Sequence, residues 1–155
     1  MRGHQLGWLR NLPIPEYQLG FLLAGLGLHL WGESRAVFDV GIIGVALGVV
    51  LIGIGIVVSI MSALSFGDET MASPDTLRTS GPYRFTRNPM YLSWLLATLG
   101  LGLFLGSWWL IAASGAAGAV TQLLVISAEE QFLTHKFGSR YENYRNQTPR
   151  WIWPL

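Results

Sequence analysis

Residues 88–128 read NPMYLSWLLATLGLGLFLGSWWLIAASGAAGAVTQLLVISA, a stretch that contains no Asp, Glu, Lys or Arg. Gly106 divides it into two apolar segments, and each is close to the roughly 17–25 residues that an α-helix needs to cross a bilayer. The stretch therefore predicts a hairpin of two membrane helices. Such a hairpin brings Glu129 and Glu130, which follow it, back to the membrane face at which Arg87 precedes it.

The rest of the chain is also apolar. Of its 155 residues 51% are hydrophobic and 12% are charged, whereas about 25% of the residues of a soluble protein are charged. Two more charge-free stretches precede the hairpin. We therefore expect one all-α integral membrane domain over residues 1–155, with four transmembrane helices. The expected spans are about 17–32, 40–66, 89–105 and 107–130, followed by a cytoplasmic C-terminal segment at 131–155.

The composition also excludes several classes of function. There is no cysteine, which removes disulfides, thiolate nucleophiles and Cys-ligated metals. The net charge is only +1, so no broad basic surface for nucleic acid is implied. We therefore expect neither a metal site nor a nucleic-acid partner.

Basic residues are distributed unevenly between the expected loops. Nine of the ten Lys and Arg residues lie before the first span, between the second and third, or after the fourth, and only Arg35 lies in another loop. Because basic residues concentrate on the cytoplasmic side, both termini and the loop 67–88 are predicted to be cytoplasmic. In a bacterium or an archaeon the expected location is the plasma (inner) membrane.

The third span begins among groups that attract anions. Asn88 and Pro89 predict a helix N-cap followed by proline at the first helical position. A helix N-terminus carries partial positive charge and unpaired N–H donors, and Arg84 and Arg87 lie within about one turn of it. This combination suits a carboxylate or a phosphate.

Glu129 and Glu130 supply the opposite charge at the end of the fourth span. Their carboxylates suit an ammonium or a nearby sulfonium. Because neighbouring helical residues point about 100° apart, we expect one glutamate to bind a ligand and the other to cap the helix or pair with Arg140 or Lys136. His135 follows closely along the chain and is expected near the same pocket.

Four tyrosines complete this constellation of polar groups. Their hydroxyls and π-faces can hold a cation or stack on a base. A molecule with an α-amino acid end, a cationic sulfur and an adenine ring would use all of these groups, and S-adenosylmethionine is such a molecule. We expect its pocket at the cytoplasmic membrane face, between the third and fourth helices, the preceding loop and the C-terminal segment. The tyrosines are Tyr83, Tyr91, Tyr141 and Tyr144.

Four motifs within residues 74–153 carry a family resemblance. They are LRTSGPYRFTRNPMY at 77–91, EE at 129–130, FGSRYENY at 137–144 and PRW at 149–151. With them the chain resembles the isoprenylcysteine carboxyl methyltransferase and phospholipid methyltransferase superfamily. The resemblance implies an all-helical membrane fold that binds S-adenosylmethionine. The cofactor contacts that it implies are Arg87, Asn88, Pro89, Tyr91, Glu129 and Glu130.

Position 88 departs from the pattern of the isoprenylcysteine enzymes, which typically have His there. Asn can donate and accept a hydrogen bond but cannot take a proton. Cofactor binding at Asn88 survives this change, whereas an acid–base role at this position does not.

We therefore predict a membrane-embedded, S-adenosylmethionine-dependent methyltransferase. Its substrate is expected to be a lipophilic small molecule or a lipidated substrate that enters from among the membrane lipids. The methyl acceptor is either an isoprenylcysteine-like carboxylate, which needs no base, or a lipid amine, for which Glu130 or a tyrosine is the candidate base. Glu130 and Arg140 are the candidate catalytic residues.

Two other functions stay open. Sterol reductases have a related C-terminal half that binds a nicotinamide dinucleotide, so an NADPH-dependent membrane reductase is one alternative. A small four-helix transporter is the other. Such transporters usually carry a charged residue inside a span, whereas all nine acidic residues here lie at expected span ends or in loops.

Overall fold

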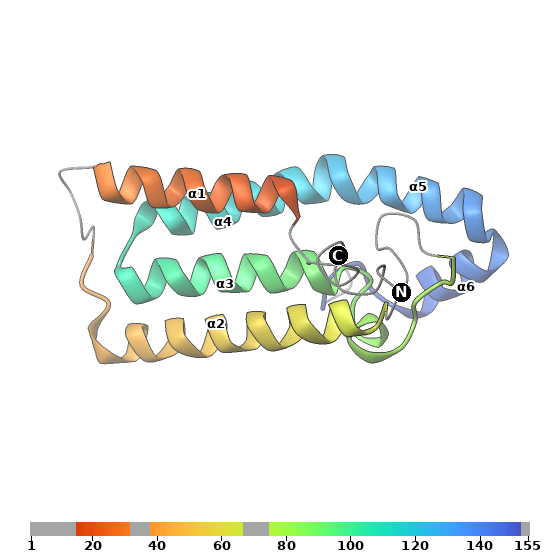
Figure 1. Cartoon of the computed structure of the whole chain (residues 1–155), viewed down its shortest axis with the longest axis horizontal. Helices are drawn as coiled ribbons and strands as arrows, with labels where there is room; N and C mark the ends of the chain where they lie inside the picture. The colour runs from red at the N-terminus through yellow and green to blue at the C-terminus, as the bar shows by residue number, and fades with distance from the viewer. Residues whose placement is uncertain (1–14, 32–37, 67–74, 153–155) are drawn as a thin grey trace, which may run out of the picture.

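The computed structural model describes residues 15–31, 38–66 and 75–152. Within these ranges the chain is helical and contains no β-strand, which confirms the all-α prediction. The first four helices lie side by side, and the last two extend beyond one end of this bundle (Figure 1). The elements are α1 (Glu16–Trp31), α2 (Gly41–Leu64), η2 (Gly81–Arg84), α3 (Pro89–Leu105), α4 (Trp108–Val120), η3 (Thr121–Val125), α5 (Ile126–Phe137) and α6 (Ser139–Gln147).

Two of the described helices are long and apolar enough to cross a membrane, judged by length and composition. They are α2 and the continuous helix Trp108–Phe137, which consists of α4, η3 and α5. α3 is apolar with 17 residues, and α1 has 16. The predicted number of four spans therefore stays a prediction. Residues 1–14, 32–37, 67–74 and 153–155 lie outside the described residues, so the predicted sides of the membrane for the termini and these loops stay predictions as well.

The hairpin of α3 and α4 forms at the predicted position. Gly106 ends α3 with a φ of 61°, a left-handed conformation that suits a residue without a Cβ. Ser107 precedes α4, and its hydroxyl accepts a hydrogen bond from the N–H of Leu110 at 3.4 Å. The turn is therefore short, and α3 and α4 run antiparallel (Figure 1).

Small residues let α2 and α3 approach closely. A Cβ at Gly48 would lie 2.7 Å from the carbonyl oxygen of Gly100, and a Cβ at Gly55 would lie 2.6 Å from the carbonyl oxygen of Ser93. Close backbone contact of this kind is typical of helix pairs in membranes. α2 also exposes large apolar side chains, as a lipid-facing helix does; examples are Ile42, Ile43, Val49, Val50 and Val57.

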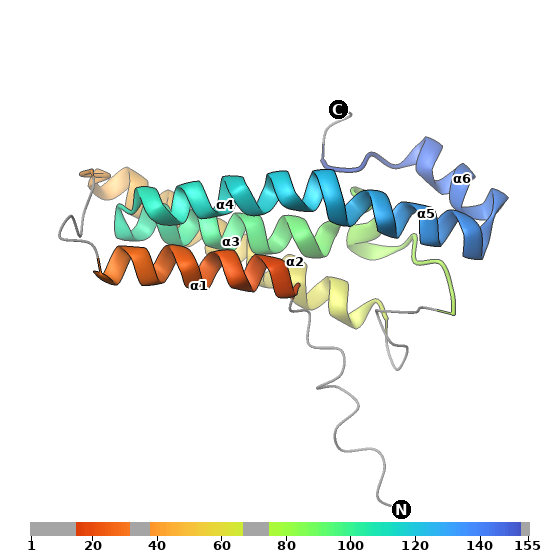
Figure 2. The ribbon, with the colours of Figure 1, turned by 90° about the horizontal axis from the view of Figure 1, so that it is seen from above.

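The C-terminal part of the chain runs past the bundle and then reverses (Figure 2). Gly138, with a φ of 53°, separates α5 from α6. After α6 the chain returns to the start of α3, where the N–H of Arg87 donates to the carbonyl oxygen of Pro149 at 2.9 Å. Residues 148–152, the C-terminal strap, thereby close against the segment that precedes α3.

Candidate functional site

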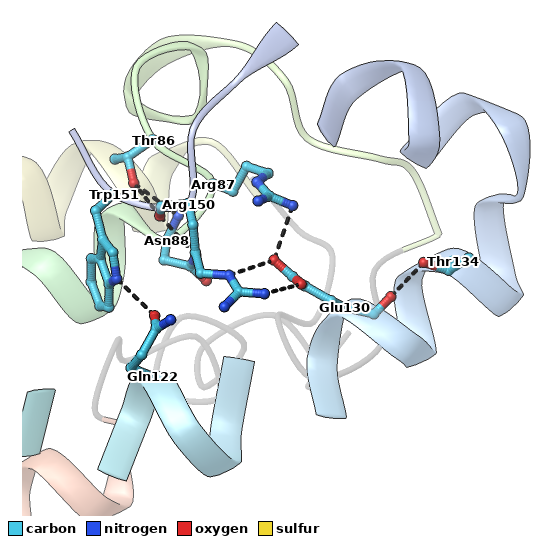
Figure 3. Close-up of polar contacts among 8 residues, drawn as sticks. All are labelled: Thr86, Arg87, Asn88, Gln122, Glu130, Thr134, Arg150 and Trp151. Atoms are coloured by element: carbon cyan, nitrogen blue, oxygen red, sulfur yellow. Dashed lines mark hydrogen bonds and ion pairs between the residues drawn. The ribbon is translucent and has the colours of Figure 1, made fainter. Parts of the chain in front are cut away.

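One main-chain oxygen fastens the segment before α3 to the C-terminal strap. The hydroxyl of Thr86 and the amide nitrogen Nδ2 of Asn88 both donate to the carbonyl oxygen of Arg150, each at 2.9 Å (Figure 3). Asn88 is the N-cap residue of α3 and Pro89 its first residue, as predicted. The Asn88 side chain, however, bonds to the strap and does not cap the helix. The N–H groups of the first turn of α3 therefore keep their capacity for another acceptor.

A carboxylate of α5 lies between two guanidinium groups. Oε1 of Glu130 is 2.9 Å from Nη1 of Arg87. Arg150 contacts both carboxylate oxygens, at 3.0 Å from Nε and 2.6 Å from Nη2 (Figure 3). Such bidentate pairs are among the stronger hydrogen bonds, and the bond to Glu130 raises the pKa of Arg150 further above its ordinary value. These three residues, the ion-pair cluster, join α5, the start of α3 and the strap.

The ion-pair cluster carries an excess of positive charge. Two guanidinium groups face one carboxylate, and the side chains of Arg87 and Glu130 are only 11% and 13% exposed. Within the described ranges, Nε of Arg87 is buried and has no hydrogen-bond partner. A buried donor without an acceptor is unfavourable, so an anion that accepts from it would bind favourably.

Glu129 has a different partner from its neighbour. The hydroxyl of Tyr91 donates to Oε1 of Glu129 at 2.8 Å. The two adjacent carboxylates thus diverge, one toward a phenol of α3 and one toward the arginines, as their separation of about 100° on a helix predicts.

The expected pairing of one glutamate with Arg140 or Lys136 is wrong. Glu130 is engaged by the two arginines of the ion-pair cluster, while Nζ of Lys136 lies 3.7 Å from Oδ1 of Asp75. The physical reason is helix geometry, because residues three or four positions apart are neighbours and Lys136 lies six positions after Glu130. Partners from other elements are closer.

Three tyrosines lie where η2 meets α6: Tyr83 from η2, and Tyr141 and Tyr144 from α6. The hydroxyl of Tyr144 donates to the carbonyl oxygen of Tyr83 at 2.6 Å. The rings of Tyr141 and Tyr144 meet edge to face, with their centroids 6.2 Å apart. Burial raises the pKa of each of the three phenols, so they are neutral at physiological pH. The phenol of Tyr141 lies beside Arg87, which brings an aromatic ring to the ion-pair cluster.

The structure separates the predicted site residues into two groups. Arg84, His135 and Arg140 are exposed. The others are connected through the contacts described above, around the start of α3. They are Tyr83, Arg87, Asn88, Pro89, Tyr91, Glu129, Glu130, Tyr141 and Tyr144.

The role of Arg150 does not follow from the sequence pattern. It lies 20 residues after Glu130, a separation from which no local contact can be inferred. The strap is held further by Trp151, whose Nε1 donates to Oε1 of Gln122 at 2.8 Å (Figure 3). The available signal is indirect: a little-exposed carboxylate needs a cationic partner, and the strap contains one.

Comparison of the sequence with known protein families identifies the family of the chain. The model of the phospholipid methyltransferase family matches residues 40–140, well over half of the chain. The chain belongs to the phospholipid methyltransferase family. The match includes Arg87, Tyr91, Glu129 and Glu130, and the resemblance found in the sequence is thereby confirmed. Membership in this family of methyltransferases, together with the two long apolar helices, makes the chain a membrane protein.

One curated relative of this phospholipid methyltransferase family member is named for metal resistance and not for methyl transfer. The cobalt-zinc-cadmium resistance protein CzcN of Cupriavidus metallidurans is 39% identical over 75 residues. The matched part is 48% of this chain and 34% of that protein, so the two correspond over about a third of the relative's length. No solved structure matches the chain.

Proposed function

We propose that this family member transfers a methyl group from S-adenosylmethionine to a lipophilic acceptor at the cytoplasmic membrane interface. The observation that carries the proposal is the pair of opposite charges where α3 meets α5. In the described part of the chain, Arg87 has a buried Nε without a partner, and Glu129 presents a carboxylate beside the ion-pair cluster. Family membership supplies the class of reaction, and these charges match the two ends of an amino acid group.

The amino acid end of the cofactor needs partners of both signs. We assign its carboxylate to Nε of Arg87 and to the N–H groups of the first turn of α3, which the Asn88 side chain does not cap. We assign its ammonium to Glu129, because the hydrogen bond from Tyr91 leaves lone pairs on that carboxylate. When bound, S-adenosylmethionine supplies an electrophilic methyl group on a sulfonium.

Glu130 has a positioning role in this proposal. Its carboxylate holds the guanidinium groups of Arg87 and Arg150, and a proton taken up by it would weaken both ion pairs. It is therefore poorly suited to act as a general base, the role that the sequence suggested for an amine acceptor. Arg140, the other candidate catalytic residue, is exposed, and we assign it no contact with the cofactor.

The C-terminal strap and α6 are assigned to covering the cofactor. Methyl transfer requires alignment of donor and acceptor and exclusion of water. The strap is fastened to the start of α3 through its main-chain carbonyl groups and to η3 through Trp151. A cover held by main-chain bonds keeps its position independently of most side-chain changes within it.

We infer that α1 and α3 complete four spans, with both termini on the cytoplasmic side. At 1.5 Å per residue, helices of 16 and 17 residues cover about 24–26 Å, slightly less than the roughly 30 Å of the hydrocarbon core. Local thinning of the bilayer accommodates such a difference at modest cost. The uneven distribution of basic residues supports the orientation.

Isothermal titration calorimetry tests the proposed cofactor. Detergent-purified protein is titrated separately with S-adenosylhomocysteine and with NADPH, and we expect binding of the first and not of the second. Arg87→Ala should weaken S-adenosylhomocysteine binding about 10- to 150-fold, because one charge-assisted contact contributes about 1.5–3 kcal/mol. Arg84→Ala is the matched control, since it removes an exposed arginine of the same motif.

The outcomes separate the proposed function from its rival. Binding of NADPH in place of S-adenosylhomocysteine would favour the reductase. Equal binding by Arg87→Ala and the parent would remove Arg87 from the site. The acceptor class follows from transfer of radiolabelled methyl groups from S-adenosylmethionine into a total lipid extract, separated into base-labile esters and base-stable amines.

A further inference from the structure

A second candidate site lies between the beginning of α1 and the π-helix η3. A pocket of about 190 Å³ is found there. On the same measure, a cavity needs only about 10–15 Å³ to hold one water molecule, so this pocket has room for a larger group. Residues of three elements line it: Glu16, Tyr17, Gln18, Tyr91, Thr121 and Val125.

Gln18 is a buried polar residue of this pocket, with 2% of its surface exposed. Its Nε2 donates to the carbonyl oxygen of Tyr91 at 3.2 Å and to the hydroxyl of Thr121 at 3.3 Å. A carbonyl oxygen only accepts hydrogen bonds, so the contact with Tyr91 fixes which end of the amide is nitrogen. Oε1 of Gln18 is the remaining end, and in the described part of the chain it has no hydrogen-bond partner.

The helix opposite Gln18 is irregular at this position. Thr121 begins the five-residue π-helix η3, which interrupts the helix between α4 and α5. Single turns of π-helix are rare and frequently occur at functional sites. The irregular turn thus presents the Thr121 hydroxyl to Gln18, next to a pocket.

The chemistry of the lining selects the kind of group that fits. Oε1 of Gln18 can only accept a hydrogen bond, and Glu16 adds a negative charge to the same lining. The lining contains no arginine or lysine among the described residues. A hydrogen-bond donor therefore fits, whereas a carboxylate or a phosphate would meet oxygen atoms with partial or full negative charge. Val125 and the ring of Tyr17 offer apolar contact for a chain attached to the donor.

We propose that this pocket is a binding site for the hydroxyl or ammonium end of a lipophilic molecule, which donates a hydrogen bond to Oε1 of Gln18. Describing that molecule as the methyl acceptor rests on the proposed function. Tyr91 connects the two places, because its carbonyl oxygen accepts from Gln18 while its hydroxyl donates to Glu129. The same residue therefore contacts this pocket and the candidate cofactor site.

A purely structural role for Gln18 gives different expectations. Polar side chains often join helices within membranes, and Nε2 of Gln18 joins α1 to α3 and η3. Ser114 provides a matched comparison, because it is also buried and its hydroxyl joins α4 to α3 through the carbonyl oxygen of Leu95 at 3.0 Å. Ser114 is not part of the pocket lining. If Gln18 only joins helices, Gln18→Met and Ser114→Ala will both lower stability and leave ligand binding unchanged.

The experiment uses three small probes that each contain six carbon atoms and differ in their polar end: hexylamine, hexanol and hexanoate. Each is titrated calorimetrically into the detergent-purified full chain, with titration into micelles alone subtracted. We expect hexylamine and hexanol to bind at least about tenfold more tightly than hexanoate, the ratio between them giving the preference for an ammonium or a hydroxyl. Gln18→Met should weaken both donors about tenfold, and Ser114→Ala should leave them unchanged.

Further measurements keep every outcome informative. If Gln18→Met does not fold, Val125→Phe fills the pocket while retaining Gln18, and it should abolish binding of the donor probes. Binding of hexanoate as tight as that of the donors, or unchanged binding by both Gln18→Met and Val125→Phe, overturns the proposal. S-adenosylhomocysteine is titrated in parallel: if it fails to bind while the donors bind, the proposed function fails and the pocket stands, and the reverse result removes only the pocket.

Discussion

Replacing Glu130 by glutamine tests whether the ion-pair cluster holds the site together. Glutamine keeps the size of the side chain and one acceptor oxygen but removes the negative charge. Two guanidinium groups, with side chains 11% and 28% exposed, are then left without a counter-charge. The perturbation therefore isolates the electrostatic contribution of this carboxylate.

The expected magnitude follows from how little the cluster is exposed. Breaking a buried ion pair costs about 3–5 kcal/mol, whereas exposed pairs contribute about 0.2–1 kcal/mol. Glu130 and Arg87 are near the buried limit and Arg150 is intermediate, so we expect Glu130→Gln to lower the free energy of unfolding by about 2–4 kcal/mol. At about 2–4 °C per kcal/mol for a chain of this size, Tm should fall by roughly 5–15 °C.

Thermal unfolding in detergent, followed by the fluorescence of the seven tryptophans, measures this effect. Glu129→Gln is the matched control, because that carboxylate accepts one hydrogen bond from Tyr91 and a glutamine oxygen can still accept it. Its Tm should fall by no more than about 4 °C, corresponding to about 1 kcal/mol for one hydrogen bond. The reasoning is refuted if Glu130→Gln lowers Tm no more than Glu129→Gln does.

Three further predictions concern the cofactor, the tyrosines and the topology. Glu129→Gln should weaken S-adenosylhomocysteine binding by about tenfold or more in calorimetry through loss of the charge partner of the ammonium, and unchanged affinity would exclude Glu129 from the site. The pKa of Tyr144 is raised by burial, so the stability contributed by its neutral phenol is complete below the ordinary pKa of 10.0 and is lost as pH rises above it. Tyr144→Phe should therefore lower Tm at pH 7, through loss of the bond to the carbonyl oxygen of Tyr83, and reduce the decline of Tm between pH 10 and 11, whereas an identical decline would contradict burial of this phenol. Ser139→Cys, in a chain that has no cysteine, should react with an impermeant maleimide in inverted membrane vesicles and not in intact cells, and the opposite pattern would reverse the topology.

The charge-free stretches of the sequence predict the apolar helices, because apolar runs and their interruptions are local properties. The turn at Gly106 and the start of α3 at Pro89 follow from the intrinsic preferences of glycine and proline. The opposite orientation of Glu129 and Glu130 follows from helix geometry alone. These features need no knowledge of which elements meet in space.

Contacts between distant segments are the part that the sequence pattern does not provide. Arg150 belongs to the PRW motif, but the motif does not tell which residue it contacts, and only the return of the strap after α6 brings it to Glu130. Asn is a residue type that often caps helices with its side chain, yet the side-chain amide of Asn88 donates to a main-chain oxygen of the strap and does not cap α3. Gln18 is a single amide in an apolar helix, and its significance depends on the irregular turn at Thr121, 103 residues away.

The order of these segments along the chain has a consequence for biosynthesis. Arg87 and Glu130 reach the membrane with α3 and α5, but the second guanidinium and the carbonyl oxygen that binds Thr86 and Asn88 belong to residue 150. A chain made only as far as α6 therefore has Glu130 with one of its two guanidinium partners, and Thr86 and Asn88 without the carbonyl oxygen to which both donate. The contacts around the start of α3 are therefore complete only once the C-terminal strap has closed against it, whatever the order in which the apolar helices enter the membrane.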